Sequence, residues 1–309
     1  MSTSPIPTID VSSLFAGPSP ARTEVDQAIG HALQTYQSFM AIGLPDDLRP
    51  DAVKMKQLFA LFQQSDDVLI PMGTVRVNPN SDRTYRGYSL YGRGNRQYDV
   101  GPEPTVAGPA IKDIERLVEP NVFPPEGAMP GWREAMLNYF RSMENFSKLV
   151  VGALARFLEV SEASAVARYD QSNSTLRIIE YPTMPGDSAT TEIGGQHTDN
   201  CGISLLWQDA PGLQMRAPDG QWHDIADRPE GISVHMGEAL ETQSNGRLHA
   251  TPHRVMSHGV ERHSIAFFLE PGLFASVKPF SLSDHETPCA PEDSYAASLI
   301  ETLRKTGRA

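Results

Sequence analysis

The feature that most constrains this chain is a His-x-Asp pair, His197 and Asp199, followed much later by a second histidine, His253. Two histidines and one carboxylate, with metal positions left open, are the ligand set expected of a non-heme Fe(II) oxygenase. In a β-strand, residues two apart point to the same face, so His197 and Asp199 can bind one ion together. His253 must then come from a distant strand of the same sheet, which predicts a barrel-like arrangement.

Short apolar segments after Ser174 predict the strands of such a sheet. Turn sequences separate the segments, among them Ala210-Pro211-Gly212 and Asn245-Gly246. Short strands at regular spacing with such turns are typical of a sandwich or a double-stranded β-helix. The predicted strands are residues 175–181, 202–207, 213–216, 232–236 and 264–269.

Helical periodicity dominates the chain before these strands. Apolar residues at i, i+3, i+4 and i+7 predict amphipathic helices. The longest apolar stripe runs from Trp132 to Leu158, and we assign its aromatic and methionine side chains to the core. The other predicted helices begin at Ser19-Pro20, span residues 48–62 and 161–169, and run from Pro291 to about Lys305.

Together these patterns predict one α+β unit of residues 1–309, in which a jelly-roll core is flanked by helices. We divide it into an N-terminal α/β cap region, a helical brace, the jelly-roll core with the metal site, and a C-terminal tail helix. The cap region contains a long loop without periodicity, and long loops in compact domains are often functional. The respective ranges are 1–110 with the loop at 73–108, 111–170, 175–275 and 276–309.

Charge and cysteine content limit the partners and the compartment. The net charge of −12 argues against nucleic acid or an anionic membrane surface, because both require a basic face. Cys201 and Cys289 are far apart and form no paired motif, which favours a reducing, cytoplasmic setting. The sequence shows no signal peptide and no apolar run near the ~20 residues that span a bilayer.

An ordered series of motifs resembles the isopenicillin N synthase-like family of 2-oxoglutarate/Fe(II)-dependent oxygenases. The resemblance covers nearly the whole chain and is most specific from Tyr181 to Pro271. A lone His-x-Asp pattern would be a weak signal, whereas the whole series in this order is strong. The main motifs are Ile6-Pro7-Thr8-Ile9-Asp10, Arg86-Gly87-Tyr88, Tyr181-Pro182, His197-Thr198-Asp199, Leu205-Leu206-Trp207-Gln208-Asp209, Met236-Gly237-Glu238, His253-Arg254-Val255 and Arg262-His263-Ser264.

The resemblance implies that His197, Asp199 and His253 are the Fe(II) ligands. Cys201 shares strand parity with Asp199, and we interpret it as a packing residue, with a thiolate ligand as the alternative. The remaining histidines of the region lack the ligand spacing and are expected to be structural, with His235 as the one that could lie near the site. These are His223, His235, His249, His258 and His263.

The resemblance also implies a site for 2-oxoglutarate. Arg262 and Ser264 match the pair that holds the far carboxylate of the cosubstrate, helped by Tyr181. The two residues are two apart and so face the same side, and a guanidinium fork with a hydroxyl suits a carboxylate in a dry pocket. The family often has an asparagine two residues before this tyrosine, where this chain has Ile179, so one hydrogen bond to the cosubstrate is missing or differently supplied.

Substrate-binding residues are expected in the loop and on the last strand. Arg83, Arg86 and Tyr88 lie in a loop segment rich in Arg, Tyr and Gly. This loop is either a solvated surface loop or a lid whose arginines meet an anionic or amino-acid-like substrate. By strand parity, Phe268 faces inward and could wall the pocket.

The implied activity is oxidation of a small metabolite by O2, with release of succinate and CO2 from 2-oxoglutarate. Hydroxylation, desaturation and ring closure stay open, as do the substrate and the oligomeric state, for which a monomer is acceptable. Family analogy alone favours a natural-product intermediate and a place in secondary metabolism. We expect no catalytic side chain beyond the iron ligands.

Three alternatives stay open. A few relatives are Fe(II) oxidases that use no 2-oxoglutarate, and there the Arg-x-Ser pair binds the carboxylate of the substrate. A zinc hydrolase could use the same three ligands, although the Arg-x-Ser pair would have no evident role. A metal-free binding protein would keep only the fold, which an intact ligand set argues against.

Overall fold

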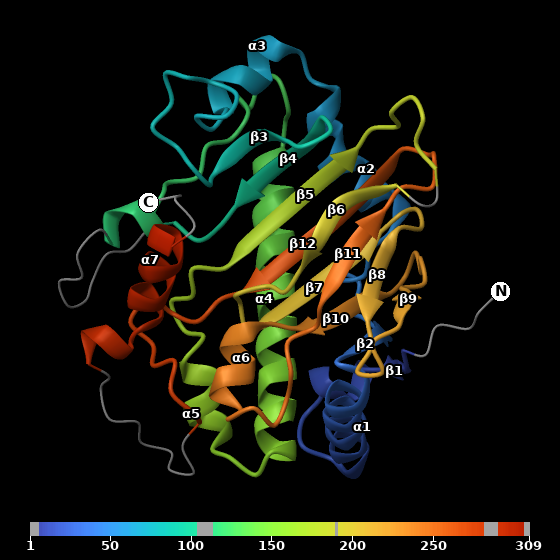
Figure 1. Ribbon diagram of the computed structural model, residues 1–309, viewed down its shortest axis with the longest axis vertical. Coiled ribbons are helices and arrows are strands. Elements are labelled where there is room, and N and C mark those ends of the chain that lie inside the picture. Colours follow the sequence, from blue (N-terminus) through green and yellow to red (C-terminus); the bar gives the residue numbers. More distant parts are fainter. Residues whose placement is uncertain (1–5, 104–113, 189–190, 281–289, 306–309) are drawn as a thin grey trace.

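Two sheets, one large and one small, form the centre of the protein (Figure 1). The computed structural model describes residues 6–103, 114–188, 191–280 and 290–305. Several expectations therefore fall outside the described residues: Cys289, the end of the predicted loop at 104–108, and the tail segments 281–289 and 306–309.

The larger sheet has eight strands and carries one wall of the site. All of its neighbouring strands are antiparallel except the first pair. Its strands, in spatial order, are β1 (Thr8–Asp10), β2 (Ser38–Ile42), β10 (Ile232–Met236), β7 (Ile203–Gln208), β12 (Arg262–Leu269), β5 (Thr175–Tyr181), β4 (Asn95–Val100) and β3 (Gly87–Tyr91).

The smaller sheet lies in front of the larger one in Figure 1 and supplies the opposite wall. It has four strands, all antiparallel to their neighbours. In spatial order these are β6 (Glu192–His197), β11 (His253–Met256), β8 (Leu213–Arg216) and β9 (Trp222–Asp224). The two facing sheets form the predicted jelly-roll core.

Helices cover the outer side of the larger sheet. The α-helices are α1 (Pro20–Tyr36), α2 (Ala52–Phe59), α3 (Asp66–Leu69), α4 (Trp132–Phe157), α5 (Glu162–Ala167), α6 (Glu238–Gln243) and α7 (Tyr295–Lys305). Short 3-10 helices are η1 (Ser12–Phe15), η2 (Ala60–Gln63), η3 (Ile70–Met72), η4 (Ile114–Leu117) and η5 (Pro291–Asp293). As the sequence predicts, the side chain of Ser19 caps α1 by accepting a hydrogen bond from the Arg22 amide at 3.2 Å.

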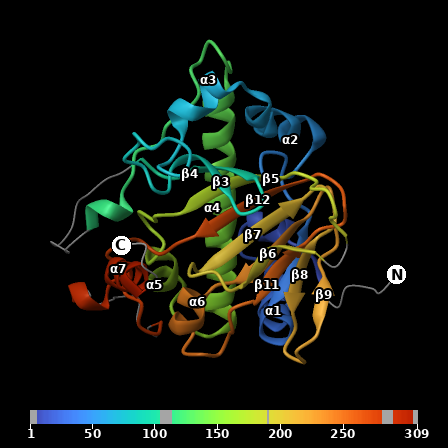
Figure 2. The same ribbon diagram turned by 45° about the horizontal axis from the view of Figure 1, so that its top comes forward.

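The long helix α4 braces the larger sheet from behind, as Figures 1 and 2 both show. Its apolar stripe is buried, and Phe140 meets Phe267 of β12 edge to face at a ring-centroid distance of 5.3 Å. At the start of the helix, the Trp132 indole N–H donates to the carbonyl of Leu58 at 3.0 Å. The predicted brace is thus present, and it fixes the outer face of β12 while the inner face is left for the site.

The predicted loop at 73–108 is interrupted by a β-hairpin. Strands β3 and β4 pair with each other, and β4 pairs with β5, so the hairpin completes one edge of the larger sheet. The strands escaped sequence analysis because polar residues occupy the face that apolar residues normally mark. On β4, Gln97 and Asp99 point inward and are buried, while Tyr98 points outward and meets Trp132 at 5.2 Å.

Strands β6, β9 and β11 were also not predicted as separate segments. Two of them are only three or four residues long, and β6 contains Gly194-Gly195 with mostly exposed side chains. Glycine has low strand propensity and carries no apolar signal. Among the described helices, none combines the length and the apolar character that crossing a bilayer requires.

The contact between β12 and α4 gives a test of the brace. Phe267→Ala should lower the free energy of unfolding by about 3–5 kcal/mol, because it leaves a cavity against Phe140 in a fully buried site. Val53→Ala, at a position 81% exposed on α2, should change it by less than about 0.5 kcal/mol. Urea denaturation measures both, and equal losses in the two variants would contradict this packing.

Candidate active site

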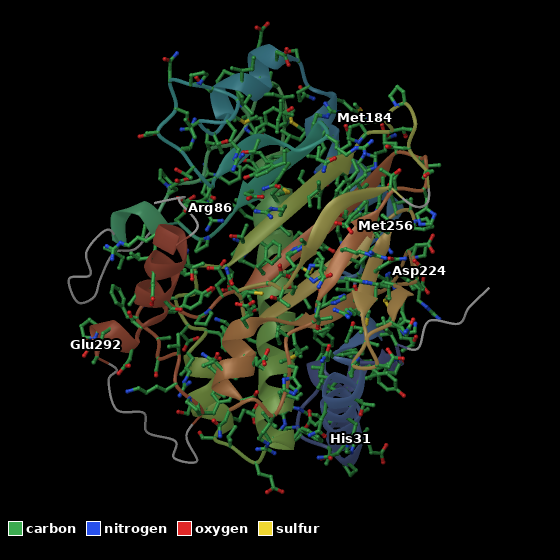
Figure 3. All side chains as sticks on the ribbon, in the orientation of Figure 1. His31, Arg86, Met184, Asp224, Met256 and Glu292 are labelled. Carbon is green, nitrogen blue, oxygen red and sulfur yellow. The ribbon has the colours of Figure 1, made fainter. Side chains whose placement is uncertain are left out.

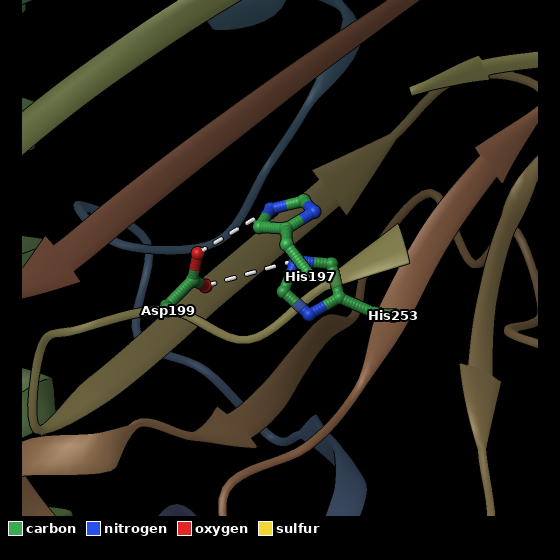
Figure 4. A group of neighbouring side chains, drawn as sticks. All are labelled: His197, Asp199 and His253. Atoms are coloured by element: carbon green, nitrogen blue, oxygen red, sulfur yellow. Dashed lines mark ion pairs between the residues drawn. The ribbon is translucent and has the colours of Figure 1, made fainter. Parts of the chain in front are cut away.

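The pairing of β6 with β11 brings the two histidines together. His197 ends β6, His253 begins β11, and the two residues are directly opposite each other in the register. Their ring centroids lie 4.3 Å apart. Together with Asp199 they offer three ligand atoms that all lie within 4.8 Å of one another (Figure 4). The predicted origin of the second histidine, a distant strand of the same sheet, agrees with this arrangement.

Hydrogen bonds orient both imidazoles toward a common point. Nδ1 of His197 lies 2.7 Å from the carbonyl of Gly195, and Nδ1 of His253 lies 3.0 Å from that of Thr251. A carbonyl can only accept, so each ring carries its proton on Nδ1 and leaves Nε2 as a lone-pair donor. The two Nε2 atoms lie 3.6 and 3.7 Å from oxygens of the Asp199 carboxylate. Burial lowers the pKa of His253, which favours the neutral form that binds metals.

Asp199 reaches the site from a turn, not from the strand. β6 ends at His197, so the strand parity used in the sequence analysis does not apply at Asp199. Instead, the Ser204 hydroxyl of β7 donates to its carboxylate, and its main-chain carbonyl accepts from the Glu238 amide at 2.8 Å. The turn presses against Gly237, where an added Cβ would lie 2.0 Å from the Cys201 carbonyl, so only glycine fits there.

The remaining candidate ligands lie outside this group. Cys201 is buried with its sulfur 3.2 Å from the Ser204 hydroxyl, and burial raises the pKa of its thiol. It is therefore a protonated packing residue. His235 is buried beside the site, with its ring 5.8 Å from that of His253, but its Nε2 lies 3.1 Å from the Ser233 hydroxyl.

A second polar site lies on the inner face of β12. Arg262 is buried opposite Tyr181 of β5, and its guanidinium lies 4.8 Å from the tyrosine ring centroid. Its Nη2 donates to Oε1 of Gln208 at 2.9 Å. Its Nη1 is buried, and no acceptor among the described residues bonds it. A buried, unpaired guanidinium nitrogen is costly, and a carboxylate would satisfy it, so the residues fit the far carboxylate of 2-oxoglutarate.

Ser264 shares this inner face, between Ile179 on β5 and Gln208 on β7. Ile179 therefore points toward the same space and supplies no hydrogen bond. Gln208 orients the arginine from the other side, and its amide is fixed by donation to the Ile225 carbonyl at 2.9 Å. Sequence analysis assigned no role to Gln208. The only sign of this role in the sequence was its position two residues after Leu206, which places both side chains on the same face of the strand that pairs with β12.

The substrate residues expected in the loop are separated by the hairpin. Arg83 donates to the Pro71 carbonyl at 2.9 Å, and Arg86 is buried against the Thr175 hydroxyl at 2.8 Å. Tyr88 pairs with Tyr98, so its side chain lies on the outer face that α4 covers. In Figure 3, Arg86 lies apart from Met256 of β11. Phe268, the fourth residue expected to bind substrate, stands on the inner face of β12.

Comparisons with known proteins agree with this geometry. The sequence pattern of the 2OG-Fe(II) oxygenase superfamily matches residues 162–271, which include all three grouped ligands and Arg262. Isopenicillin N synthase of Streptomyces griseus is 26% identical over 315 residues, covering 97% of this chain and 92% of that protein. Gibberellin 2-beta-dioxygenase 3 of Arabidopsis thaliana is 28% identical over 292 residues, covering 89% and 78%.

A solved structure shares the fold. A full-length Neurospora crassa protein, crystallised in complex with alpha-KG and thymine, superposes with a TM-score of 0.76 at 23% identity, covering 97% of both chains. The jelly roll and the His-Asp-His group, which could hold a metal ion, agree with the architecture of a non-heme iron oxygenase. Residues 162–271 are similar to the 2OG-Fe(II) oxygenase superfamily, and the chain is a 2-oxoglutarate/Fe(II)-dependent oxidoreductase, as the sequence predicts.

Removal of one ligand tests the metal group. Asp199→Ala should weaken Fe(II) or Mn(II) binding by about 100-fold or more, because even partners outside the ligand shell contribute 10–100-fold. Asp224→Ala is the control, since Asp224 is an exposed aspartate at the end of β9 and lies outside the ligand group. Equilibrium metal titration gives both affinities, and wild-type affinity in Asp199→Ala would refute the assignment.

A charged network behind the site makes stability depend on pH. Burial alone would lower the pKa of His263, but hydrogen bonds to Asp209 and Glu180 outweigh it and raise the pKa from 6.5 to about 9. The raised pKa adds stability that is fully present below pH 6.5 and is lost as the pH rises through 9. The Nδ1 atom lies 2.8 Å from Asp209, and the ring packs 4.8 Å from that of Phe59.

We therefore expect His263→Gln to lower the melting temperature near pH 7 and to have less effect near pH 10. His249→Gln is the control, because His249 is exposed and, among the described residues, forms an ion pair with one carboxylate, that of Glu241. Differential scanning calorimetry across this pH range measures the difference. A pH-independent effect of His263→Gln would contradict the charge-based account.

Proposed function

We propose that this enzyme oxidises a small molecule with His197, Asp199 and His253 as iron ligands and Arg262, Ser264 and Tyr181 as the 2-oxoglutarate site. When bound there, Fe(II) supplies the oxygen chemistry that oxidises the substrate while the keto acid is converted to succinate and CO2. The observation that carries the proposal is the buried Nη1 of Arg262, which lacks a partner among the described residues and lies on the strand that also runs past the ligand group.

The register of the large sheet supports this placement of the two sites. Ser204, which bonds Asp199, is paired with Phe268 of β12. Arg262 and Ser264 precede Phe268 at even spacing, so all three side chains stand on the same face of the same strand. The inner face of β12 therefore leads from the metal group to the guanidinium, which is the direction that a keto acid bound at both ends must follow.

The chain's own residues would position the cosubstrate. Arg262 would fix the far carboxylate bidentately, Ser264 would donate its hydroxyl, and Tyr181 closes one side of the guanidinium. Both carbonyl-bound imidazoles keep their Nε2 atoms directed at the metal, so no reorientation is needed on binding. We assign no further side chain to proton transfer.

The expectation of an anionic or amino-acid-like substrate rested on loop arginines. The protein itself engages each of them: Arg83 with Pro71, Arg86 with Thr175, Arg93 with Asp187 and Arg96 with Glu180. They therefore give no separate support for an anionic substrate. The thymine complex of the structural neighbour supports a small-molecule substrate for this fold.

Substitution of the arginine tests the proposal. Arg262→Met should raise the KM for 2-oxoglutarate by about 10- to 100-fold, because hydrogen bonds to a charged group contribute about 1.5–3 kcal/mol. Arg216→Met is the control, since this arginine is exposed on β8 and bonds the carbonyl of Gly220. Succinate release measured against 2-oxoglutarate concentration gives both constants.

Two results would contradict the proposal. Substrate oxidation without any succinate would favour the Fe(II) oxidase that uses no keto acid, in which Arg262 binds the carboxylate of the substrate. Turnover that needs zinc and no oxygen would favour the hydrolase.

A further inference from the structure

The sheet register leaves a second group of polar residues on the inner face, across β12 from the strand that carries Gln208. Asp99 of β4 is paired with Arg177 of β5, which is paired in turn with Ala266 of β12. Phe268 stands two positions further along β12 on the same face. Neither Arg177 nor Asp99 has a role in holding iron or 2-oxoglutarate.

Arg177 is held rigidly by its neighbour. Its Nε and Nη2 donate to the two oxygens of Asp99 at 2.8 and 2.7 Å, and the Gln97 amide donates to the same carboxylate at 3.0 Å. The guanidinium carbon lies 5.2 Å from the ring centroid of Phe268. Two bonds and an aromatic ring fix the plane of the guanidinium, so little entropy is lost when a ligand binds it.

One edge of this guanidinium is left for a ligand. Both hydrogen bonds to Asp99 come from Nε and Nη2, and Nη1 has no acceptor among the described residues. The Arg177 side chain is 30% exposed, whereas that of Asp99 is only 4% exposed. The residue paired with Arg177 on β12 is Ala266, whose small side chain does not reach over the guanidinium. Arg177 lies over Phe268, whose register partner Ser204 donates to the Asp199 carboxylate, so the guanidinium and Asp199 are linked along the same inner face.

The charges around Arg177 determine which kind of hydrogen-bond acceptor fits beside its Nη1. Asp99 already neutralises Arg177, and a second carboxyl, Glu270, interacts with both Arg86 and Arg177. Burial raises the pKa of Glu270 to about 7, although Arg86 and Arg177 oppose this shift. An incoming carboxylate would lose its hydration and lie beside the Asp99 carboxylate, which already pairs with Arg177 through two hydrogen bonds. A neutral carbonyl oxygen would accept from Nη1 at much smaller cost.

We propose that Arg177, oriented by Asp99 and backed by Phe268, binds a neutral, planar carbonyl group of the substrate, such as an amide, imide or lactam. This inference rests on the proposed function, because it takes the inner face beside the iron ligands as the substrate site. It makes Arg177 a specificity-determining residue that donates from Nη1 to an oxygen acceptor, while Phe268 covers one face of the flat group.

Matched amide and acid probes test the proposal. Benzamide with benzoate, and nicotinamide with nicotinate, differ in each pair only by a neutral against a charged carbonyl group. Isothermal titration under anaerobic conditions into protein loaded with Fe(II) and 2-oxoglutarate should show at least about tenfold tighter binding of each amide, a difference of about 1.4 kcal/mol. Tighter binding of the acids, or no binding of either amide, would overturn the proposal.

Three variants separate recognition from general structure. Arg177→Met should lose amide binding by about tenfold or more, and Asp99→Asn should shift the preference toward the acids, because the arginine charge is then uncompensated. Arg133→Met is the matched control, since Arg133 lies 4.8 Å from the Phe123 ring and 3.9 Å from Glu103, away from the inner face. It should bind the amides as the wild type does.

Binding of 2-oxoglutarate by the same protein samples distinguishes a failure of the proposed function from a failure of the role of Arg177. If the wild type does not bind 2-oxoglutarate, the proposed function fails. If it binds 2-oxoglutarate while Arg177→Met keeps wild-type amide affinity, only the role of Arg177 is refuted. Loss of both ligands in Arg177→Met would show a structural role and would also contradict the inference.

Discussion

The cross-strand pair of His197 and His253 is the contact on which the site depends. A shift of one residue between β6 and β11 would turn one imidazole to the other face of the small sheet, and the ligand set would be lost. On its other side β11 pairs with β8, and each imidazole is oriented by a hydrogen bond to a carbonyl two residues earlier in its own segment. The three candidate ligand atoms are therefore already grouped in the structure without an ion.

The two faces of the larger sheet have different roles: the outer face packs against helices, and the inner face carries the candidate site. The outer face of β12 packs Phe267 on α4, while the inner face presents Arg262, Ser264 and Phe268 in alternation. Since one strand carries both sets, the helix that buries the outer face also fixes the spacing of the inner residues. The hairpin of β3 and β4 extends this inner face and brings Asp99 beside Arg177.

The grouping of the three candidate ligands could be predicted, because they lie in short ordered motifs. The strands β5, β8 and β10 and the long helix were also clear from periodicity. The hairpin was missed since its inward residues are polar, and Asp199 was assigned to a strand although it lies in a turn held by Ser204. Sequence spacing alone could not show that Gln208 orients Arg262, or that Arg177 stands on the inner face of the larger sheet. Both depend on pairing between distant strands.

The most direct test is a crystal structure determined without oxygen from protein with Fe(II) and 2-oxoglutarate. We expect one iron bound by Nε2 of His197, Nε2 of His253 and the Asp199 carboxylate. We also expect the far carboxylate of the keto acid within hydrogen-bond distance of Nη1 of Arg262. Iron bound elsewhere, or a keto acid whose far carboxylate leaves Nη1 unpaired, would contradict the account.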